Sequence, residues 1–388
     1  KIYCAMDAKM QKYIEKEFIM WGLIFGCVLL FAVACFVYLI SRFYKFRFMK
    51  KITMNKKFLT ILLSIIIILV MFTVLTITMN MMNSIIVLMH LVVIWLIVDF
   101  IFFIIKKCRK KPFKFYFQGI IAMVLTAVYL TFGWYFAHNV VATDYNLTTD
   151  KDMNSLRIVQ LSDSHIGATF HYKEFSQYVD TMNKENPDVV VITGDFVDDD
   201  TSKEDMIQSC KALSKFKTKY GVYFVYGNHD KGYYGKEYRG YDGNDLAKEL
   251  RKNGVKVLED ESVLLNNKFY IVGRQDYSEV EKGGTRASAK DLVKNLDCNK
   301  YIIMLDHQPN HYKEEKNANV DLVLSGHTHG GQLIPITYSG EWLGMNDKTY
   351  GYEREKNTDF IVSSGIGDWS IKFKTGCVAE YVVVDINK

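Results

Sequence analysis

The sequence predicts an α/β sandwich with mixed sheets that follows a group of transmembrane helices. Two patterns in the 388 residues support this fold class. The first third holds long apolar runs of the length that crosses a bilayer. The rest alternates apolar β-branched runs with helical patterns and then has more strands, as α/β domains with mixed sheets do. We therefore treat the two regions as separate domains.

Four apolar runs mark the first region, at about residues 19–40, 58–78, 85–105 and 118–137. Each has about the 20 residues that a helix needs to cross ~30 Å of hydrocarbon. A cleaved signal peptide would account for one such run but not for four. We expect a membrane domain of four transmembrane helices over residues 1–137. Asp99, in the third run, lies close enough to its basic end to pair with a lysine there.

Charge predicts the orientation of these helices. Residues 1–137 carry 17 Lys and Arg against 4 Asp and Glu, whereas residues 138–388 carry 31 against 39. Basic residues gather between the first two runs and after the third, and basic loops stay in the cytoplasm. We expect a multi-pass protein of the cell membrane whose C-terminal domain is extracytoplasmic, although lysines near the N-terminus oppose this weakly. Because the folded domain is acidic, no nucleic-acid partner is expected.

The second region begins with a polar, aperiodic stretch, residues 138–154, which we interpret as a linker. The domain itself covers residues 155–388. Strands are expected at residues 157–161, 189–193, 222–226, 255–258, 263–265, 268–272, 301–305, 322–324, 360–363 and 378–385. Helices are expected at residues 173–185, 203–216, 244–253 and 287–296. The first strands are almost wholly apolar, which is typical of strands buried on both faces.

Polar side chains follow five of the expected strands at their carboxyl ends. They are Asp163, His165, Asp195, Asp198, Asn228, His229, Asp230, His307, His327 and His329. In open α/β sheets these ends share one crevice, so distant segments can converge there. Carboxylate, amide and imidazole groups without a thiolate suit Mn, Fe, Zn or similar ions. Two such ions ~3.5–4 Å apart clamp phosphoryl oxygens and activate water, so the set predicts phosphoester hydrolysis.

The same residues carry a family resemblance. The motifs are Asp163-Ser-His165, Gly194-Asp195-Phe-Val-Asp198, Gly227-Asn228-His229-Asp230, His307 and Gly326-His327-Thr-His329. Together they resemble the calcineurin-like metallophosphoesterases over about residues 155–388. The resemblance implies a four-layer α/β/β/α sandwich with a dimetal site at the strand ends.

The resemblance also implies roles for the residues of the site. Asp163, His165 and His329 would bind the first metal ion. Asn228, His307 and His327 would bind the second, and Asp195 would bridge the two.

His229 would be the general acid, with Asp198 orienting its imidazole. The residues support this role because His229 lies at the site yet is not needed to complete either ligand set. A histidine beside two cations resists protonation, so it needs an acidic partner to act as an acid near neutral pH. Asp230 stays open as the alternative partner.

The glycine-rich histidine motif, with Gln308 and Pro309 after His307, looks most like a bacterial membrane-tethered branch of the family. That branch includes enzymes that resemble UDP-diacylglucosamine pyrophosphohydrolases. We expect a membrane-anchored binuclear phosphohydrolase that cleaves a phosphoester or pyrophosphate bond. Its substrate would be a phosphorylated small molecule or a phospholipid-like envelope precursor, and its other partner the lipid bilayer.

Two alternatives remain open at this point. The chain could be a metal-binding sensor or regulatory membrane protein, or a binding module with a non-catalytic phosphoesterase-like domain. The tyrosine-rich residues 231–244 could be an ordinary packed loop. They could also form a lip for an anionic headgroup or for the bilayer interface, where tyrosine rings are common.

Overall fold

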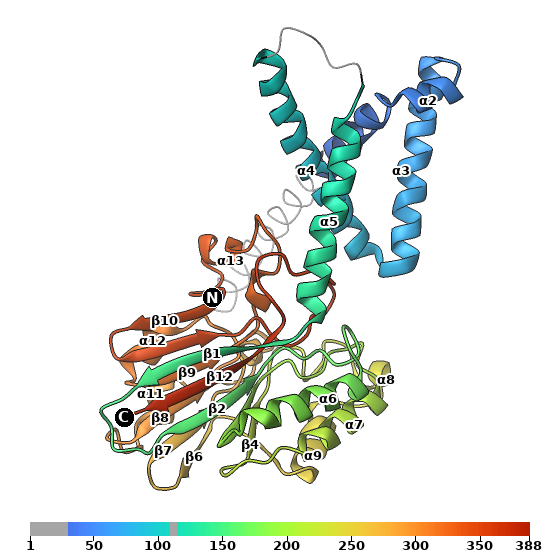
Figure 1. Cartoon of the computed structure of the whole chain (residues 1–388). Helices are drawn as coiled ribbons and strands as arrows, with labels where there is room; N and C mark the ends of the chain where they lie inside the picture. The colour runs from blue at the N-terminus through green and yellow to red at the C-terminus, as the bar shows by residue number, and fades with distance from the viewer. Residues whose placement is uncertain (1–29, 109–114) are drawn as a thin grey trace, which may run out of the picture. The chain divides into compact units, whose positions relative to one another are not determined.

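The computed structural model describes residues 30–108 and 115–388. The chain divides into two compact units, Lys1–Leu130 and Thr131–Lys388 (Figure 1), and the division falls inside one helix. We describe each unit by itself.

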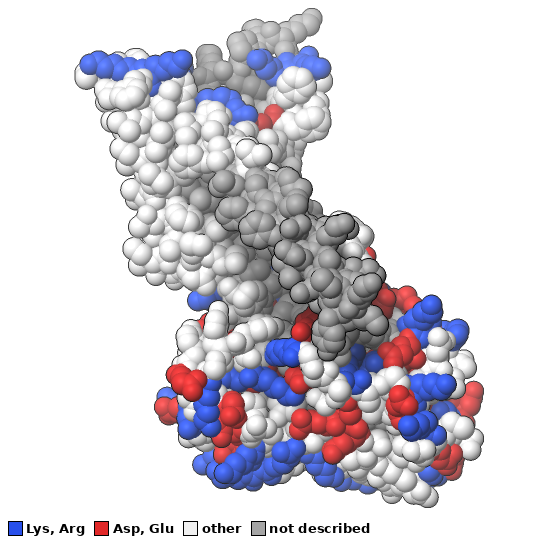
Figure 2. Space-filling view, turned by 180° about the vertical axis from the view of Figure 1, so that it is seen from behind, with Lys and Arg blue, Asp and Glu red and all other residues white. Residues whose placement is uncertain are grey.

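Three described helices are long and apolar enough to cross a membrane: α3 (Lys57–Met79), α4 (Met81–Cys108) and α5 (Gln118–His138). Their surface is largely uncharged, and Lys and Arg gather at one end of the first unit (Figure 2). Within residues 30–108 and 115–388, three of the four expected spans are present. The predicted run at residues 19–40 lies partly outside the described residues. Its described part belongs to a shorter apolar helix, Leu30–Phe43, which a short helix α2 (Arg47–Ile52) follows.

Asp99 of α4 has a partner, as expected, but the partner is an arginine. Its Oδ2 lies 2.6 Å from Arg42 Nε, and the Tyr38 hydroxyl donates to the same oxygen at 2.9 Å. The charge is therefore compensated within the first unit, as a buried or lipid-facing carboxylate requires.

Two six-stranded mixed sheets form the second unit. The first has the order β1-β12-β2-β3-β4-β5 and the second β10-β11-β9-β8-β7-β6. The strands of the first sheet are β1 (Val141–Thr148), β12 (Glu380–Asn387), β2 (Leu156–Leu161), β3 (Val189–Thr193), β4 (Val222–Val225) and β5 (Val255–Val257). Those of the second are β10 (Gly351–Glu355), β11 (Thr358–Val362), β9 (Leu322–Ser325), β8 (Tyr301–Leu305), β7 (Phe269–Gly273) and β6 (Glu261–Leu265). Strands β2 to β5 run parallel, as do β7, β8, β9 and β11.

Alternating side chains explain why the central strands are apolar throughout. On β3, Val191 points into a core shared by both sheets, where Ile303 of β8 also lies. Val190 and Ile192 point to the other face, which packs on helices α6 (Tyr172–Met182), α7 (Lys203–Leu213) and α9 (Gly243–Lys252). The outer face of the second sheet packs on α11 (Ala289–Val293) and α12 (Tyr312–Asn317). Central strands such as β3 and β8 are thus buried on two faces, as the sequence pattern predicted.

Short elements complete the unit: the 3₁₀ turns η1 (Asn183–Glu185) and η2 (His329–Gly331), and the helices α8 (Lys236–Arg239), α10 (Ser278–Glu281) and α13 (Ser339–Trp342). Helices this short carry no periodic signal in the sequence. Four further helices were predicted at their observed places, but α11 is shorter than expected.

The linker expected at residues 138–154 contains a strand. Residues Val141–Thr148 form β1, which pairs in parallel with β12 along all eight positions. The strand lies at a sheet edge and is mostly polar, so it lacks the apolar alternation that marks a strand. Backbone pairing with the edge of the sheet stabilises it instead. Ala379 closes the corner, because its carbonyl accepts from Val141 N and its own N–H donates to Phe136 O in α5.

Hydrogen exchange measures whether this segment is a strand or a tether. We expect the amides of β1 that donate to β12 to exchange far more slowly than those of the polar loop that follows, because paired amides exchange only on opening. Mass-spectrometric exchange on the full chain in detergent gives both rates. Equally fast exchange in β1 and in the loop would restore the flexible linker.

Candidate metal centre

The predicted site residues do follow strands whose carboxyl ends meet at one edge of the two sheets. Asp163 and His165 follow β2, and Asp195 follows β3. Asn228 and His229 follow β4, His307 follows β8, and His327 and His329 follow β9. Non-glycine residues with positive φ cluster there: Asp163 (49°), His165 (38°), Asp195 (51°), His327 (70°) and His329 (50°). Such conformations cost about 1–3 kcal/mol each and gather at functional sites.

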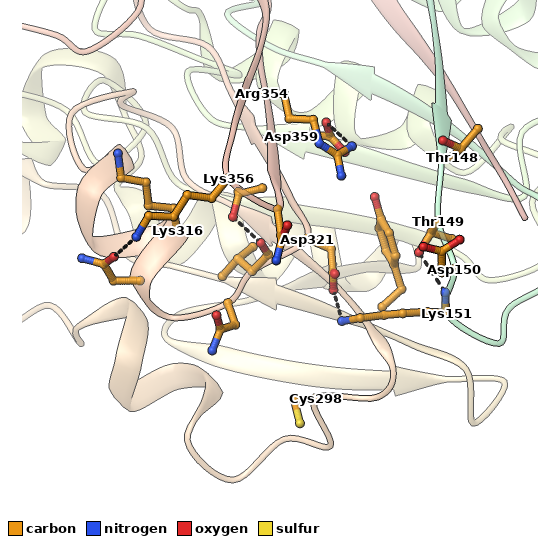
Figure 3. Close-up of a pocket in the computed structure, with 16 residues that line it drawn as sticks. Thr148, Thr149, Asp150, Lys151, Cys298, Lys316, Asp321, Arg354, Lys356 and Asp359 are labelled. Carbon is orange, nitrogen blue, oxygen red and sulfur yellow. Dashed lines mark hydrogen bonds and ion pairs between the residues drawn. The ribbon is translucent and has the colours of Figure 1, made fainter.

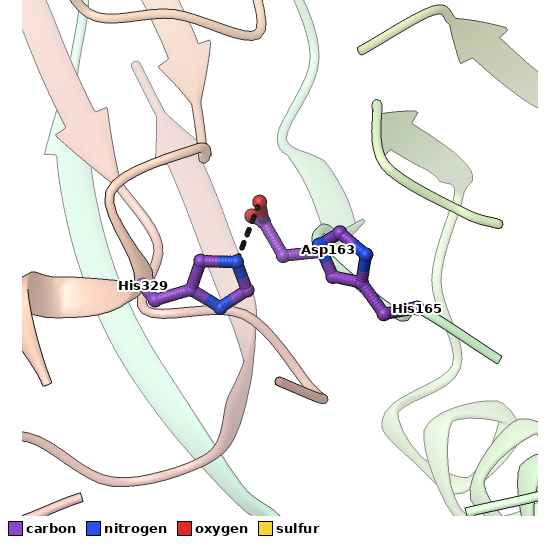
Figure 4. A group of neighbouring side chains, drawn as sticks. All are labelled: Asp163, His165 and His329. Atoms are coloured by element: carbon purple, nitrogen blue, oxygen red, sulfur yellow. Dashed lines mark ion pairs between the residues drawn. The ribbon is translucent and has the colours of Figure 1, made fainter. Parts of the chain in front are cut away.

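Asp163, His165 and His329 form the first group, with ligand atoms all within 4.8 Å of one another (Figure 4). All three side chains are buried, and His329 Nε2 lies 3.8 Å from Asp163 Oδ1. The His165 Nδ1 position faces Asp198 Oδ2 at 3.2 Å. That contact leaves Nε2 of the same ring directed at the centre, 3.6 Å from Asp195 Oδ2.

Asp195, His307 and His327 form the second group. His307 Nε2 lies 3.2 Å from Asp195 Oδ2 and 3.2 Å from Asn228 Oδ1. The Nδ1 of the same ring lies 2.8 Å from Thr193 O, so the backbone carbonyl can fix the tautomer that leaves Nε2 free. Asp195 Oδ2 therefore faces a histidine of each group.

The donor atoms fit a pair of divalent cations. His165 Nε2 and His327 Nδ1 are buried and find no hydrogen-bond partner among the described residues, which is rare for buried polar groups. The backbone also leaves no room for a larger residue beside Asp163. A Cβ at Gly326 would lie 2.2 Å from Asp163 Oδ2. Imidazole, carboxylate and amide oxygen suit Mn, Fe or Zn.

His229 lies beside the two groups and belongs to neither. Its backbone N–H donates to Asp195 Oδ1 at 2.9 Å, which fixes the chain at this point. The ring lies between Tyr233 and Trp369, with centroid separations of 5.0 and 5.9 Å. Burial lowers the pKa of His229 below its ordinary value. The charges of Asp195 and Asp198 raise the pKa again, but only in part.

The two carboxylates expected to orient His229 make other contacts. Asp198 faces His165, as described above, and also accepts from Thr201 Oγ1 at 3.1 Å. Asp230 accepts from the backbone N–H groups of Asp195, Phe196, Val197 and Gly227 at 2.7–3.1 Å. Neither carboxylate hydrogen-bonds the His229 ring among the described contacts. Asp198 thus orients a proposed ligand, and Asp230 fixes the loop that carries Asp195.

A buried carboxylate beside His329, that of Asp368, was not predicted from the sequence. Asp368 Oδ1 lies 3.4 Å from His329 Nδ1 and 3.2 Å from Lys374 Nζ, and accepts from Gln332 Nε2 at 2.6 Å. Burial opposes the charge of Lys374, but Asp368 raises its pKa above the usual value. Asp368 follows the carboxyl end of β11, so the strand-end rule could have found it.

The tyrosine-rich residues 231–244 include both a packed tyrosine and exposed tyrosines, so each of the two interpretations holds for part of them. Tyr241 is fully buried under the Arg239 guanidinium, 4.3 Å from the ring centroid, and is a core residue. Tyr233, Tyr234 and Tyr238 are exposed. The Tyr233 hydroxyl accepts from Asn228 Nδ2 at 2.7 Å, so this one tyrosine reaches the site.

A cavity of about 760 Å³ lies at the opposite edge of the sheets (Figure 3). It is lined where β8 and β11 begin and where β1 ends, by residues that include Tyr301, Thr358 and Thr148. Ion pairs within it join Lys151 to Asp321 at 2.6 Å and Arg354 to Asp359 at 3.1 Å. Its charges are largely compensated, and neither ligand group lies there.

The backbone at Gly227 passes so close to Asp195 that a substitution there tests the site. A Cβ at this position would lie 2.2 Å from Asp195 Oδ1 and 2.5 Å from Asp195 N. We expect Gly227→Ala to lose bound metal and to lower turnover about 100-fold, since a displacement of about 1 Å at a site has that effect. The control is Gly235→Ala, whose Cβ would meet only the mobile end of Glu237. Full metal content in Gly227→Ala, measured by elemental analysis, would contradict the assignment.

Comparison with known proteins agrees with this geometry. The calcineurin-like phosphoesterase family matches residues 156–331, which include all seven proposed ligands. An uncharacterized metallophosphoesterase of Aquifex aeolicus is 32% identical over 247 residues, which are 62% of this chain and 90% of that protein. An uncharacterized metallophosphoesterase of Campylobacter jejuni is 30% identical over 60% of this chain and 59% of that protein.

A transmembrane protein with metallophosphoesterase domain from Danio rerio is 30% identical over 68% of this chain. This chain therefore spans about three-fifths of the length of the Danio rerio and Campylobacter relatives. The apolar helices α3, α4 and α5, together with the name of this relative, indicate a membrane protein. The family match and the Aquifex relative show that the chain belongs to the calcineurin-like metallophosphoesterases.

Proposed function

We propose that this chain is a membrane-anchored phosphohydrolase that uses two divalent metal ions. The observation that carries the proposal is the meeting of two ligand groups at one carboxylate. Asp195 Oδ2 lies 3.6 Å from His165 Nε2 and 3.2 Å from His307 Nε2. The first ion would be held by Asp163, His165 and His329, and the second by Asn228, His307 and His327. Asp195 would bridge them.

When bound, two divalent cations would activate both the phosphoryl group and the attacking water. The chain's own residues supply the rest. Hydrolysis forms a P–O bond to water and breaks the P–O bond to the leaving group, whose oxygen then needs a proton. His229 is the residue we assign to that transfer, because its ring is at the site and no ligand group uses it. Burial lowers the pKa of the ring, and the charges of Asp195 and Asp198 oppose this, so these carboxylates would favour its protonation without a hydrogen bond. The rings of Tyr233 and Trp369 contact the His229 ring.

Asp198 and Asp368 would act as positioning residues. Each faces the Nδ1 side of one proposed ligand, His165 or His329. A carboxylate in that place fixes the tautomer and raises the basicity of the ligand. This role replaces the one that the sequence predicted for Asp198.

The finer features of the resemblance are part of the same proposal. The three separate apolar cores, one between the sheets and one on each outer face, support a four-layer sandwich. The bond cleaved would be a phosphoester or pyrophosphate bond, possible substrates being small phosphorylated molecules and phospholipid-like envelope precursors. The membrane-tethered, UDP-diacylglucosamine pyrophosphohydrolase-like branch is the one that the motifs favour.

Replacing His229 separates chemistry from metal binding. With Mn²⁺ and bis(4-nitrophenyl) phosphate, we expect the full chain to release nitrophenol and a chelator to abolish the reaction. His229→Ala should lower kcat by about 10²–10⁴, the usual contribution of a general acid, while both metal ions stay bound. Asp198→Ala is the contrasting variant, and it should weaken metal binding about 10–100-fold.

Three results would count against this assignment. Loss of metal from His229→Ala would make His229 a ligand. Unchanged metal affinity in Asp198→Ala would remove its positioning role. A protein that holds two metal ions and hydrolyses no phosphoester or pyrophosphate would favour the sensor or regulatory alternative.

We further propose that the second unit lies outside the cytoplasm. Lys106 and Lys107 at the end of α4, and Lys50 and Lys51 in α2, are the basic groups that would stay inside. Alkaline phosphatase fused after residue 140 should be active and green fluorescent protein at the same place dark. The reverse pattern would put the metal centre in the cytoplasm.

A further inference from the structure

Exposed apolar side chains gather in one short segment of the second unit. Residues 334–345 carry Ile334, Ile336, Tyr338, Trp342, Leu343 and Met345, which are 47–74% exposed. They make up six of the thirteen exposed large hydrophobic residues between positions 139 and 388. Single exposed apolar residues are ordinary, but a contiguous group marks a contact surface. We call residues 334–345 the apolar segment.

The apolar segment is held firmly from beneath. Leu333 and Thr337 are buried, and the Thr337 hydroxyl donates to Leu333 O at 3.2 Å. At its far end, Glu341 accepts from Thr349 N at 2.5 Å. The exposed side chains therefore stand on an ordered base.

The segment lies beside the end of the membrane helix α5. Ile334 N donates to Thr375 Oγ1 at 3.0 Å, and the Thr375 side chain packs on Gly133 of α5. Lys374 N, one residue earlier, donates to Gly133 O at 2.9 Å. All of these groups belong to the second unit, and Figure 1 shows α13 and the last turn of α5 at the same end of it.

Aromatic residues at the end of α5 indicate where this helix leaves the membrane. Trp134, Tyr135 and Phe136 are exposed there, at the carboxyl end of a 21-residue apolar helix. Tryptophan and tyrosine gather at the headgroup level of a bilayer, where a ring can be apolar on one side and wet on the other. The contacts through Thr375 and Lys374 place the apolar segment next to that belt.

The composition of the apolar segment indicates what kind of surface it contacts. Residues 332–346 contain no lysine or arginine, and their single acid, Glu341, is tied to the backbone. Such a surface gains nothing from the negative charge of anionic headgroups, whereas Trp342, Leu343 and Met345 gain by leaving water. The partner is therefore an apolar interface rather than a charged one.

We propose that the apolar segment rests in the interface of the same bilayer that α5 crosses. The segment follows directly on His329 and Gln332, and Gln332 bonds Asp368 behind His329. Trp369, 45% exposed, follows Asp368 in the chain and lies against the His229 ring, with 5.9 Å between the ring centroids. The mouth of the metal centre thus opens beside the lipid headgroups. Resting on the proposed function, this makes the substrate an amphiphile whose phosphate lies at the membrane surface.

Photo-crosslinking tests whether the apolar segment contacts lipid, and it does not depend on enzymatic activity. The full chain is placed in phosphatidylcholine proteoliposomes with p-benzoylphenylalanine at Trp342 or, as control, at Leu264. Leu264 is 40% exposed on β6, the edge strand at the other end of the second sheet from β10. We expect lipid adducts at position 342, unchanged by high salt, and none at 264. Absence of lipid adducts at 342, or adducts to a second protein copy in their place, would overturn the proposal.

Kinetics tests the substrate class. The variant Trp342→Ser/Leu343→Ser/Met345→Ser should lower kcat/KM about tenfold for a 4-nitrophenyl phosphodiester carrying a long alkyl chain in the vesicles, since the reacting group is then misplaced. Hydrolysis of soluble bis(4-nitrophenyl) phosphate should be unchanged. Equal loss on both substrates would overturn the amphiphile assignment. Adducts at 342 in a protein that hydrolyses neither substrate would support the seating and overturn the proposed function.

Discussion

The Asp195 carboxylate is the interaction on which the site depends. One oxygen faces His165 and His307, and the other accepts from the backbone N–H of His229. The residue is almost wholly buried and has a positive φ. A buried charge is tolerated only where positive charge and hydrogen bonds compensate it. The imidazoles supply part of that compensation, and cations bound between the two groups would supply more.

The fold stabilises this costly conformation from outside the ligand set. Asp230 accepts four backbone N–H groups and so joins the loop after β3 to the loop after β4. Gly227 and Gly194 let those loops approach within a distance that any Cβ would obstruct. The motif residues that ligate nothing are therefore as necessary as the ligands, because they hold the strained backbone that directs them.

Much of the fold and of the site could be predicted because both follow from the same pattern. Strands buried on two faces, such as β3 and β8, are read directly as apolar runs, and the carboxyl ends of parallel strands share an edge. The place of Asp163 or His327 follows from that rule. The direction of a side chain does not. Asp198 lies three residues after Asp195 in the loop that follows β3, and nothing in the sequence says that it faces His165 instead of His229. Strands β1 and β10 were missed for a different reason, since backbone pairing at a sheet edge stabilises them and their side chains carry no apolar alternation.

The strand within the expected linker connects the metal centre to the last turns of α5, which belong to the same unit. A flexible tether of some 17 residues would let a domain sample many orientations, as polar linkers do. Instead, α5 leads into β1 after two residues. Ala379 bonds both Phe136 of the helix and Val141 of the strand, and Lys374 bonds Gly133 of the helix while its ammonium reaches Asp368 behind His329. The path from the helix to a proposed metal ligand thus runs through buried, hydrogen-bonded groups. Under the proposed function, a site fixed in this way would select substrates by the height at which they present a phosphate as well as by their chemistry, which is a selection that a freely tethered domain could not make.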